Sequence, residues 1–127
     1  MAIAKELELR LPNSPGALAE VCLALAGEHV NILAMTLDSA GRLRLVVDNH
    51  VRAAGALSER RHSVATRDVI VLTVSHAPGS LSPVAALAAD AGLNLEYAYT
   101  GASDNGRCAM VVLGVDDVQR AAALAGL

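Results

Sequence analysis

The chain has 127 residues, of which 54% are hydrophobic and only 2% aromatic, and its formal net charge is -3. This composition is typical of a globular protein with an aliphatic core and argues against intrinsic disorder. A negative net charge and only two aromatic residues, Tyr97 and Tyr99, exclude the basic stacking surface used for nucleic acid, so no nucleic-acid partner is expected.

The first half of the chain predicts a strand, a helix, two strands, a helix and a strand. Leu7, Leu9 and Leu11 alternate with charged residues, as in a half-buried strand. Ser14 is suited to cap the following helix, which extends to about residue 27, and Pro15 to occupy its first position. Apolar periodicity and turn residues then predict strand 31–37, turn 38–41, strand 43–48, helix 50–61 and strand 62–67.

The second half predicts the same order but ends one element earlier. A strand over Val69–Ser75 precedes a helix that begins near Ser80, has Pro83 in its first turn and ends near residue 91. Strands 94–100 and 107–113 and a helix over 116–125 follow. Asp116 and Asp117 suit the start of that last helix, because acidic residues favour a helix N-terminus. Tyr97 and Tyr99 are expected to fill space above small alanine side chains, a structural role that we favour over contact with a ligand.

The two halves repeat one another. Pro15-Gly16 recurs as Pro78-Gly79 at an offset of 63 residues (79 − 16), and Asn31 recurs as Asn94 at the same offset. Farther along, matching apolar pairs indicate offsets of 65 and then 67, which we assign to insertions in loops. The repeat divides the chain into one unit of residues 1–67 and a second of residues 68–127.

The repeated order predicts an α+β fold of two ferredoxin-like βαββαβ units. Two right-handed β-α-β crossovers on one sheet give the strand order 4-1-3-2 with both helices on one face. The second unit is expected to lack its last strand, because the counterpart of strand 62–67 would fall beyond Leu127. Strand Val69–Ser75 would then have an open edge, which a second copy of the chain covers in a homodimer. Alternatively, strand 62–67 crosses over to serve the second unit.

The loops that lead into the two predicted helices resemble those of ACT domains. The first loop reads Leu-Pro-Asn-Ser-Pro-Gly-Ala-Leu over residues 11–18, and His-Val-Asn-Ile follows over residues 29–32. The second reads Val-Ser-His-Ala-Pro-Gly-Ser-Leu over residues 74–81, and Ala-Gly-Leu-Asn-Leu follows over residues 91–95. With two copies in register, the chain is similar to small stand-alone tandem ACT proteins. The resemblance implies a regulatory module that binds a free amino acid at an interface between ACT domains.

The candidate ligand site combines each of these loops with the start of the next strand. Backbone N–H groups at a helix N-terminus attract a carboxylate, and a glycine lets a ligand approach the backbone closely. The asparagine of a neighbouring domain could take the amino group, and Glu96 could supply a counter-charge. The candidate residues are Asn13, Ser14, Pro15, Gly16, Ala17, Leu18, Asn31, Ile32, His76, Ala77, Pro78, Gly79, Ser80, Leu81, Asn94, Leu95 and Glu96.

The two loops are expected to differ in shape, which makes equal ligand occupancy doubtful. Ala77 stands where the first loop has the helix-capping Ser14, and Pro83 delays the start of the second helix. His76 replaces Asn13, and the repeat makes a ligand contact by this histidine as plausible as an inert loop position.

Nothing in the residue pattern indicates a catalytic, cofactor or metal site. Lys5 is the only lysine, and no set of nucleophile and base recurs at either loop. The histidines have no metal-ligand spacing with Cys22 or Cys108, which are expected to be reduced, buried thiols. The chain start does not read as a signal peptide and the apolar stretch 84–89 is too short for a bilayer, so we expect a cytoplasmic protein without a membrane partner.

The favoured function is therefore a sensor that binds a free amino acid and acts in trans on a partner, for example a metabolic enzyme. A second interpretation is an interaction or assembly module whose sites have lost their ligand. A small ferredoxin-like enzyme is the third and weakest interpretation. Binding of amino acids to the native state separates the first two, because a ligand raises the melting temperature.

Overall fold

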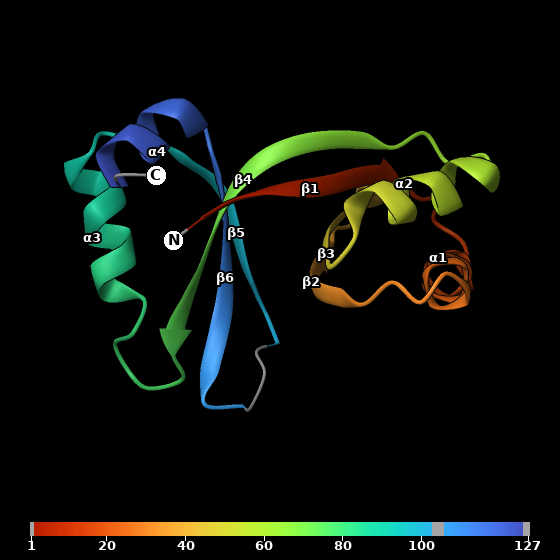
Figure 1. Cartoon of the computed structure of the whole chain (residues 1–127), viewed down its shortest axis with the longest axis horizontal. Helices are drawn as coiled ribbons and strands as arrows, with labels where there is room; N and C mark the ends of the chain where they lie inside the picture. The colour runs from red at the N-terminus through yellow and green to blue at the C-terminus, as the bar shows by residue number, and fades with distance from the viewer. Residues whose placement is uncertain (1, 103–105, 126–127) are drawn as a thin grey trace. The chain divides into compact units, whose positions relative to one another are not determined.

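The computed structural model describes residues 2–102 and 106–125 (Figure 1). Its backbone contacts divide the chain into two compact units, one of Lys5–Arg67 and one of residues 68–125 together with residues 2–4. Both units contain helices and strands, so the chain has the mixed α+β fold that its sequence predicts.

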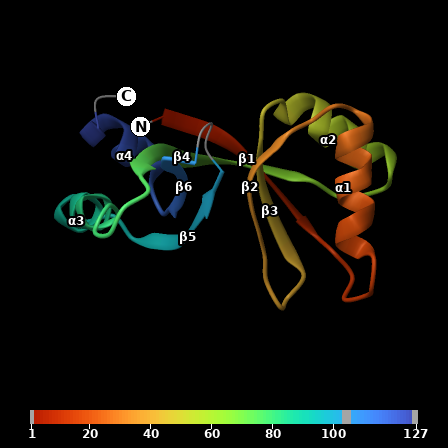
Figure 2. The ribbon, with the colours of Figure 1, turned by 90° about the horizontal axis from the view of Figure 1, so that it is seen from below.

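The first unit is a sheet with two helices. Its strands are β1 (Ala2–Arg10), β2 (Ile32–Leu37), β3 (Arg42–Val47) and the start of β4 (Ala65–Ser75), and they lie in the order β4-β1-β3-β2. Its helices, α1 (Ala17–Gly27) and α2 (His50–Glu59), lie on the same face of the sheet (Figure 2). This is the strand order 4-1-3-2 expected from the sequence.

The core of the first unit is aliphatic, as the scarcity of aromatic residues requires. Leu7 and Leu9 of β1 and Leu11, which directly follows it, are buried as the predicted strand pattern requires, but Glu6, predicted on the outward face, is buried as well. They pack with residues from β3 and both helices, among them Val21, Leu25, Leu43, Leu45 and Leu57.

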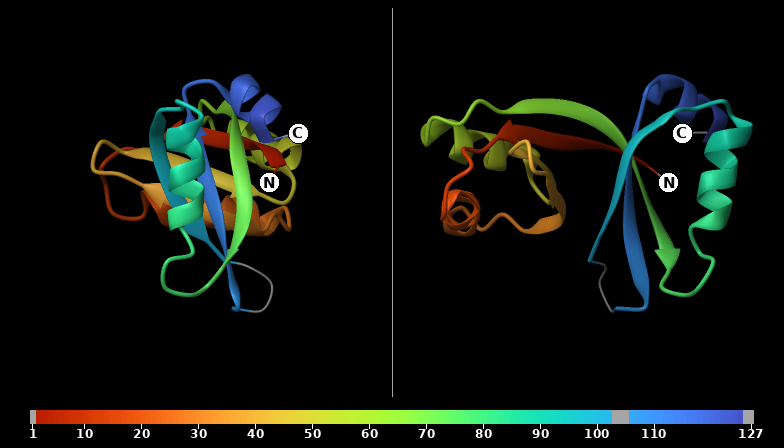
Figure 3. Two further views of the ribbon diagram at one scale, coloured as in Figure 1. Left: turned by 90° about the vertical axis from the view of Figure 1, so that its left-hand side faces the viewer. Right: turned by 180° about the vertical axis from the view of Figure 1, so that it is seen from behind.

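The second unit repeats this arrangement. Its strands are the rest of β4, β5 (Leu95–Gly101) and β6 (Cys108–Val115), and its helices are α3 (Ser82–Asp90) and α4 (Val118–Ala125). The strand order is β1-β4-β6-β5, and Figure 3 shows both helices on one side of the sheet. Pro83 lies in the first turn of α3, where its missing N–H costs no helical hydrogen bond, as predicted.

Two expectations about the strands are wrong. The segments predicted as strands 62–67 and 69–75 form one continuous strand, β4, which contributes to both units. The sheet of the second unit also has a fourth strand, contrary to the prediction. β1 neighbours β4, and residues 2–4 of β1 group with the second unit. The start of β1 thus gives β4 a neighbour on the side opposite β6.

The offset between the two units also differs from the sequence estimate. Met35 pairs with Leu45 in the first unit and Ala98 pairs with Leu113 in the second. The offset is therefore 63 in β2 and β5 (98 − 35) but already 68 in β3 and β6 (113 − 45), not 65 and then 67. The whole insertion lies in the turn between β5 and β6. The offset of 65 came from matching the Val-Val pair of β3 with a Val-Val pair of β6 that is not at the equivalent position.

The start of α4 agrees with its prediction only in part. The side chain of Asp117 accepts a hydrogen bond from the backbone N–H of Arg120 at 3.0 Å and so caps the helix. Asp116 instead accepts from the backbone N–H and the side-chain amide of Asn94, both at 3.2 Å. Within the described residues, no helix is long and apolar enough to cross a membrane.

Candidate functional site

A cleft of about 260 Å³ opens at the first loop, between β1 and α1. The loop faces the turn between β2 and β3, so that the cleft has one wall from each. We call it the first loop cleft. Its lining residues are Leu11, Pro12, Asn13, Ser14, Gly16, Ala17, Leu18, Ala19, Leu37, Asp38, Ser39 and Gly41.

The loop presents backbone donors to this cleft. Gly16 precedes α1 with a φ of 86°, a left-handed conformation that glycine adopts without strain. Among the described residues, the N–H groups of Gly16, Leu18 and Ala19 have no hydrogen-bond acceptor. Unpaired N–H groups at a helix start carry partial positive charge, so this wall of the cleft suits an anionic group.

The predicted helix start is wrong in the first unit. Helix α1 begins at Ala17, and no side chain caps it. Ser14 and Pro15 lie in the turn before the helix, where the carbonyl of Ser14 accepts from the N–H of Ala17 at 3.3 Å. The left-handed Gly16 ends the turn and cannot continue into a right-handed helix, which moves the helix start past it.

The opposite wall of the first loop cleft carries a carboxylate. Asp38 Oδ1 accepts hydrogen bonds from the backbone N–H groups of Ala40 at 2.9 Å and Arg42 at 3.0 Å. The hydrogen bond from Arg42 is the main cause that holds the pKa of Asp38 below its usual value, so the side chain is ionised at neutral pH. The cleft therefore combines N–H donors on one wall with a negative charge on the other, which complements the two opposite charges of a zwitterion.

A second cleft, of about 400 Å³, opens at the corresponding loop between β4 and α3. We call it the second loop cleft. Its far wall is formed by described residues at the end of β5 and before and at the start of β6, in the position that the β2–β3 turn has in the first unit. Its described lining residues are Val74, Ser75, His76, Ala77, Ser80, Leu81, Thr100, Gly101, Gly106, Cys108 and Ala109.

The two loops share the conformation of their turn but differ at the helix start, so the expected difference in shape is confirmed only there. Gly79 has a φ of 79°, close to the 86° of Gly16. The N–H of Ser80 donates to the carbonyl of Ala77 at 3.3 Å, as Ala17 does to Ser14 in the first loop. The difference is farther on, because α3 begins at Ser82, two residues later than the counterpart of Ala17 would place it. The Ser80 hydroxyl reinforces the turn through the Ala77 carbonyl at 2.8 Å and the Ser75 hydroxyl at 2.9 Å.

The structure brings together most of the predicted loop residues but separates them from the predicted strand residues of the same unit. Asn13, Ser14, Gly16, Ala17 and Leu18 line the first loop cleft, and His76, Ala77, Ser80 and Leu81 line the second. Pro15, Pro78 and Gly79 shape the loops without lining either cleft. The strand residues Asn31, Ile32, Asn94, Leu95 and Glu96 line neither.

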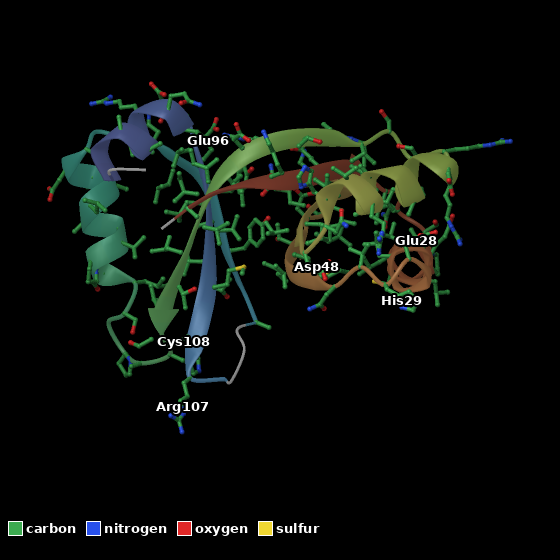
Figure 4. The ribbon with its side chains drawn as sticks, viewed as in Figure 1. Glu28, His29, Asp48, Glu96, Arg107 and Cys108 are labelled. Atoms are coloured by element: carbon green, nitrogen blue, oxygen red, sulfur yellow. The ribbon has the colours of Figure 1, made fainter. Side chains whose placement is uncertain are left out.

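The two asparagines instead have equivalent local partners, an aspartate at the end of the neighbouring strand in each unit. The N–H of Asn31 donates to Asp48 Oδ1 at 2.9 Å, and the Asn94 N–H donates to Asp116. Each pair ties the start of one strand to the end of its neighbour, at the strand end away from the loop cleft of its own unit. Figure 4 shows Glu96 and Cys108 at opposite ends of the second unit, and Cys108 is the one that lines the cleft. A contribution of these strand residues from a neighbouring domain stays a prediction.

The residues that sequence reasoning missed are those of the far walls. Asp38, Ser39 and Gly41 follow β2, and Thr100, Gly101 and Gly106 flank the corresponding turn after β5. The strand order 4-1-3-2 contains the necessary signal, because it places the β2–β3 turn at the same end of the sheet as the loop after β1. In the described part of the chain, no three His, Cys, Asp or Glu residues are grouped so as to hold a metal ion.

Comparison with known proteins identifies solved structures with a similar fold. No protein-family model and no curated protein matches the chain. A solved protein from Bacteroides thetaiotaomicron is similar, at 28% identity and a TM-score of 0.83 over 98% of this chain and 87% of that one. The regulatory subunit of aspartate kinase from Thermus thermophilus, in its ligand-free form, is 19% identical with a TM-score of 0.65, over 88% and 84% of the two chains.

A third similar structure is E. coli aspartokinase III in complex with lysine and aspartate. It is 21% identical with a TM-score of 0.56, over 88% of this chain and 29% of that one. Aspartokinase regulatory subunits are ACT-domain proteins, and the fold described above is that of a small ACT-type protein. The resemblance seen in the two loops of the sequence is thereby confirmed at the level of the fold.

Proposed function

We propose that the protein is a regulatory sensor, a tandem of ACT-type units over residues 1–67 and 68–127, that binds a free amino acid at its loop clefts. The observation that carries the proposal is the recurrence of one cleft in both units. Each is built from a left-handed glycine, a helix start and the facing turn. The lining residues of the two clefts differ, yet the cleft is kept in both units, and this recurrence supports a functional role for it.

The chemistry of the first loop cleft fits the two charges of an amino acid. The ligand carboxylate accepts from the unpaired N–H groups of Leu18 and Ala19, and the ammonium group faces the ionised Asp38. In the second loop cleft, the N–H of Leu81 has no acceptor among the described residues, and His76 lines the wall. The two clefts therefore differ in charge, and we expect them to differ in affinity.

The output of the sensor is exerted in trans, in the cytoplasm, on a partner such as a metabolic enzyme. One structural neighbour is a regulatory subunit of an enzyme, and another is an enzyme in complex with two amino acids. These neighbours support a regulatory role in general and, with the lack of a catalytic pattern in the sequence, favour a protein that is not itself an enzyme.

Calorimetry with each of the twenty amino acids tests the proposal. The substitutions Ala19→Asp and Ser82→Asp place a carboxylate at the start of α1 and of α3, where it competes with the ligand carboxylate. Both residues are exposed, and an acidic residue at a helix start does not destabilise the helix, so folding is preserved. We expect at least a tenfold loss of affinity in the affected cleft.

Ala26→Asp and Ala89→Asp are the matched controls, because they add the same charge to exposed positions at the other ends of the same helices. They should leave affinity unchanged. If folded wild-type protein gives no heat with any amino acid, the sensor proposal fails and the interaction or assembly module becomes the better interpretation.

A further inference from the structure

The two units can be compared position by position because their hydrogen bonds coincide. At the end of the first helix of each unit, the N–H of Val30 donates to the Leu25 carbonyl and that of Leu93 to the Ala88 carbonyl, both at 3.0 Å. In the sheets, Met35 and Ala98 pair with the equivalent residues Leu45 and Leu113. These pairs make residues 63 apart structurally equivalent through helix and following strand.

At three equivalent positions, the second unit carries alanine where the first has a larger apolar side chain that is buried or half-buried. Leu25 is replaced by Ala88, Cys22 by Ala85 and Met35 by Ala98. Leu25 is only 1% exposed, and Met35 packs against the core of the first unit. The second unit therefore lacks the apolar side chains that fill the corresponding space in the first.

The missing volume is present as open space. Ala85 and Ala98 line a cleft of about 220 Å³ between α3 and strands β5 and β6, and Ala88 lines a small adjoining cavity of about 40 Å³. We call the larger space the apolar cleft. Its walls consist mainly of aliphatic side chains, including Val84, Leu95 and Leu113, which it shares with the small cavity.

Helix α3 is correspondingly poorly covered. It buries only Ala88, whereas α1 buries Val21, Ala24 and Leu25. Leu81 and Leu87 remain 50% and 49% exposed beside the cleft and cavity that they line. Protein interiors are normally close-packed, so an open apolar space under a helix costs stability unless something fills it.

The apolar cleft adjoins the second loop cleft, since Leu81 and Thr100 line both. A molecule whose carboxylate binds at the loop can therefore extend an apolar group beneath α3. Building on the proposed amino-acid site, we infer that the ligand of the second unit is an amino acid with an apolar aliphatic side chain, which occupies the apolar cleft. The first unit fills the same space with its own Cys22, Leu25 and Met35 and has no such preference.

A homologous series measures this directly. Calorimetry with glycine, alanine, 2-aminobutyrate, norvaline and leucine should show affinity rising roughly fourfold for each methylene that becomes buried. The polar isosteres asparagine, for leucine, and threonine, for valine, should bind at least tenfold more weakly than their apolar partners.

The variant Ala98→Met restores the residue of the first unit and fills the apolar cleft. We expect it to abolish the gain from alanine to leucine while alanine itself still binds, and to raise the melting temperature without ligand. Ala89→Met is the control, because it adds the same side chain to an exposed position of α3 outside the cleft. It should keep the full gain.

The outcomes separate the two proposals. Binding of no amino acid at all defeats the sensor proposal itself. Binding of alanine with a flat series to leucine, or an undiminished gain in Ala98→Met, overturns the apolar ligand class while leaving amino-acid binding intact.

Discussion

Single residues explain how two units with different side chains keep one backbone. In the first unit, the small Ala34 pairs across the sheet with Val46, and in the second, the large Tyr97 pairs with Gly114. A Cβ on Gly114 would overlap the ring of Tyr97, so the glycine is required by the tyrosine opposite. Tyr97 also stacks on Tyr99, with ring centroids 6.3 Å apart. The sequence predicts that the tyrosines fill space above small alanine side chains, but the small residue opposite Tyr97 is this glycine.

Exchanging the pair tests this compensation. Gly114→Val should lower the free energy of unfolding by about 1–3 kcal/mol, because the new side chain is overpacked against Tyr97. Tyr97→Ala/Gly114→Val rebuilds the pair of the first unit and should recover most of that loss. Urea unfolding of the four proteins in a double-mutant cycle gives the coupling. Strictly additive losses would show that the two positions do not compensate.

The carboxyl group of Asp38, in the turn between β2 and β3, makes the stability of this turn depend on pH. Its pKa is lowered in the folded protein, chiefly by the hydrogen bond from the Arg42 N–H. A lowered pKa means that the stabilising contribution is complete above the ordinary pKa and is lost as pH falls through the folded value. Asp38→Ala should therefore lower the melting temperature slightly at pH 7. The difference from wild type should vanish in thermal melts well below pH 4, and a difference that persists there contradicts the assignment.

At the scale of elements, the sequence predicts what is local and misses what is tertiary. The helices and the inward pattern of Leu7, Leu9 and Leu11 follow from periodicity, which is a property of each segment alone. The start of α1 was misplaced because a left-handed glycine overrode a good capping serine. The far walls of the clefts were missed because they come from turns distant in sequence, which only the strand order brings to the loops.

The cap of α2 makes an element-level prediction. Asn49 precedes the helix with an extended backbone, and its side chain accepts from the Arg52 N–H at 3.0 Å. Asn49→Ala should cost about 1 kcal/mol of unfolding free energy, because one N–H at the helix start loses its acceptor. Asn49→Asp, the residue type that caps α4, should cost little. Chemical denaturation of both variants decides the matter, and an equal loss in both would argue against capping as the cause.

At the scale of the whole molecule, β1 and β4 each contribute residues to both units. The sequence could not predict this, because apolar alternation identifies a strand but not its partner. The division into residues 1–67 and 68–127 was inferred from the repeat. The contacts of residues 2–4 modify it by grouping the chain start with the second unit. Because residues 2–4 cover only part of β4, the rest of this strand can still pair with a second copy of the chain.

The remaining edge of β4 carries the last prediction. β1 and β4 run in opposite directions (Figure 1), so residues 2–4 lie beside the part of β4 that follows Arg67. Three extended residues span about 10 Å, which leaves the end of the strand near Thr73 without that neighbour. The His76 N–H donates to the carbonyl of Arg107, the residue before β6, at 2.8 Å. Alternation along the antiparallel pair of β4 and β6 then turns the Thr73 N–H away from β6.

We therefore predict that a second copy of the chain pairs with this edge. Light scattering at micromolar concentration should give twice the monomer mass of 13.0 kDa. Thr73→Pro removes the outward N–H but no hydrogen bond to β6, so it should yield a folded monomer, whereas Thr73→Val should remain a dimer. A monomeric wild type refutes the dimer, and a dimeric Thr73→Pro with an unchanged circular dichroism spectrum moves the interface away from β4.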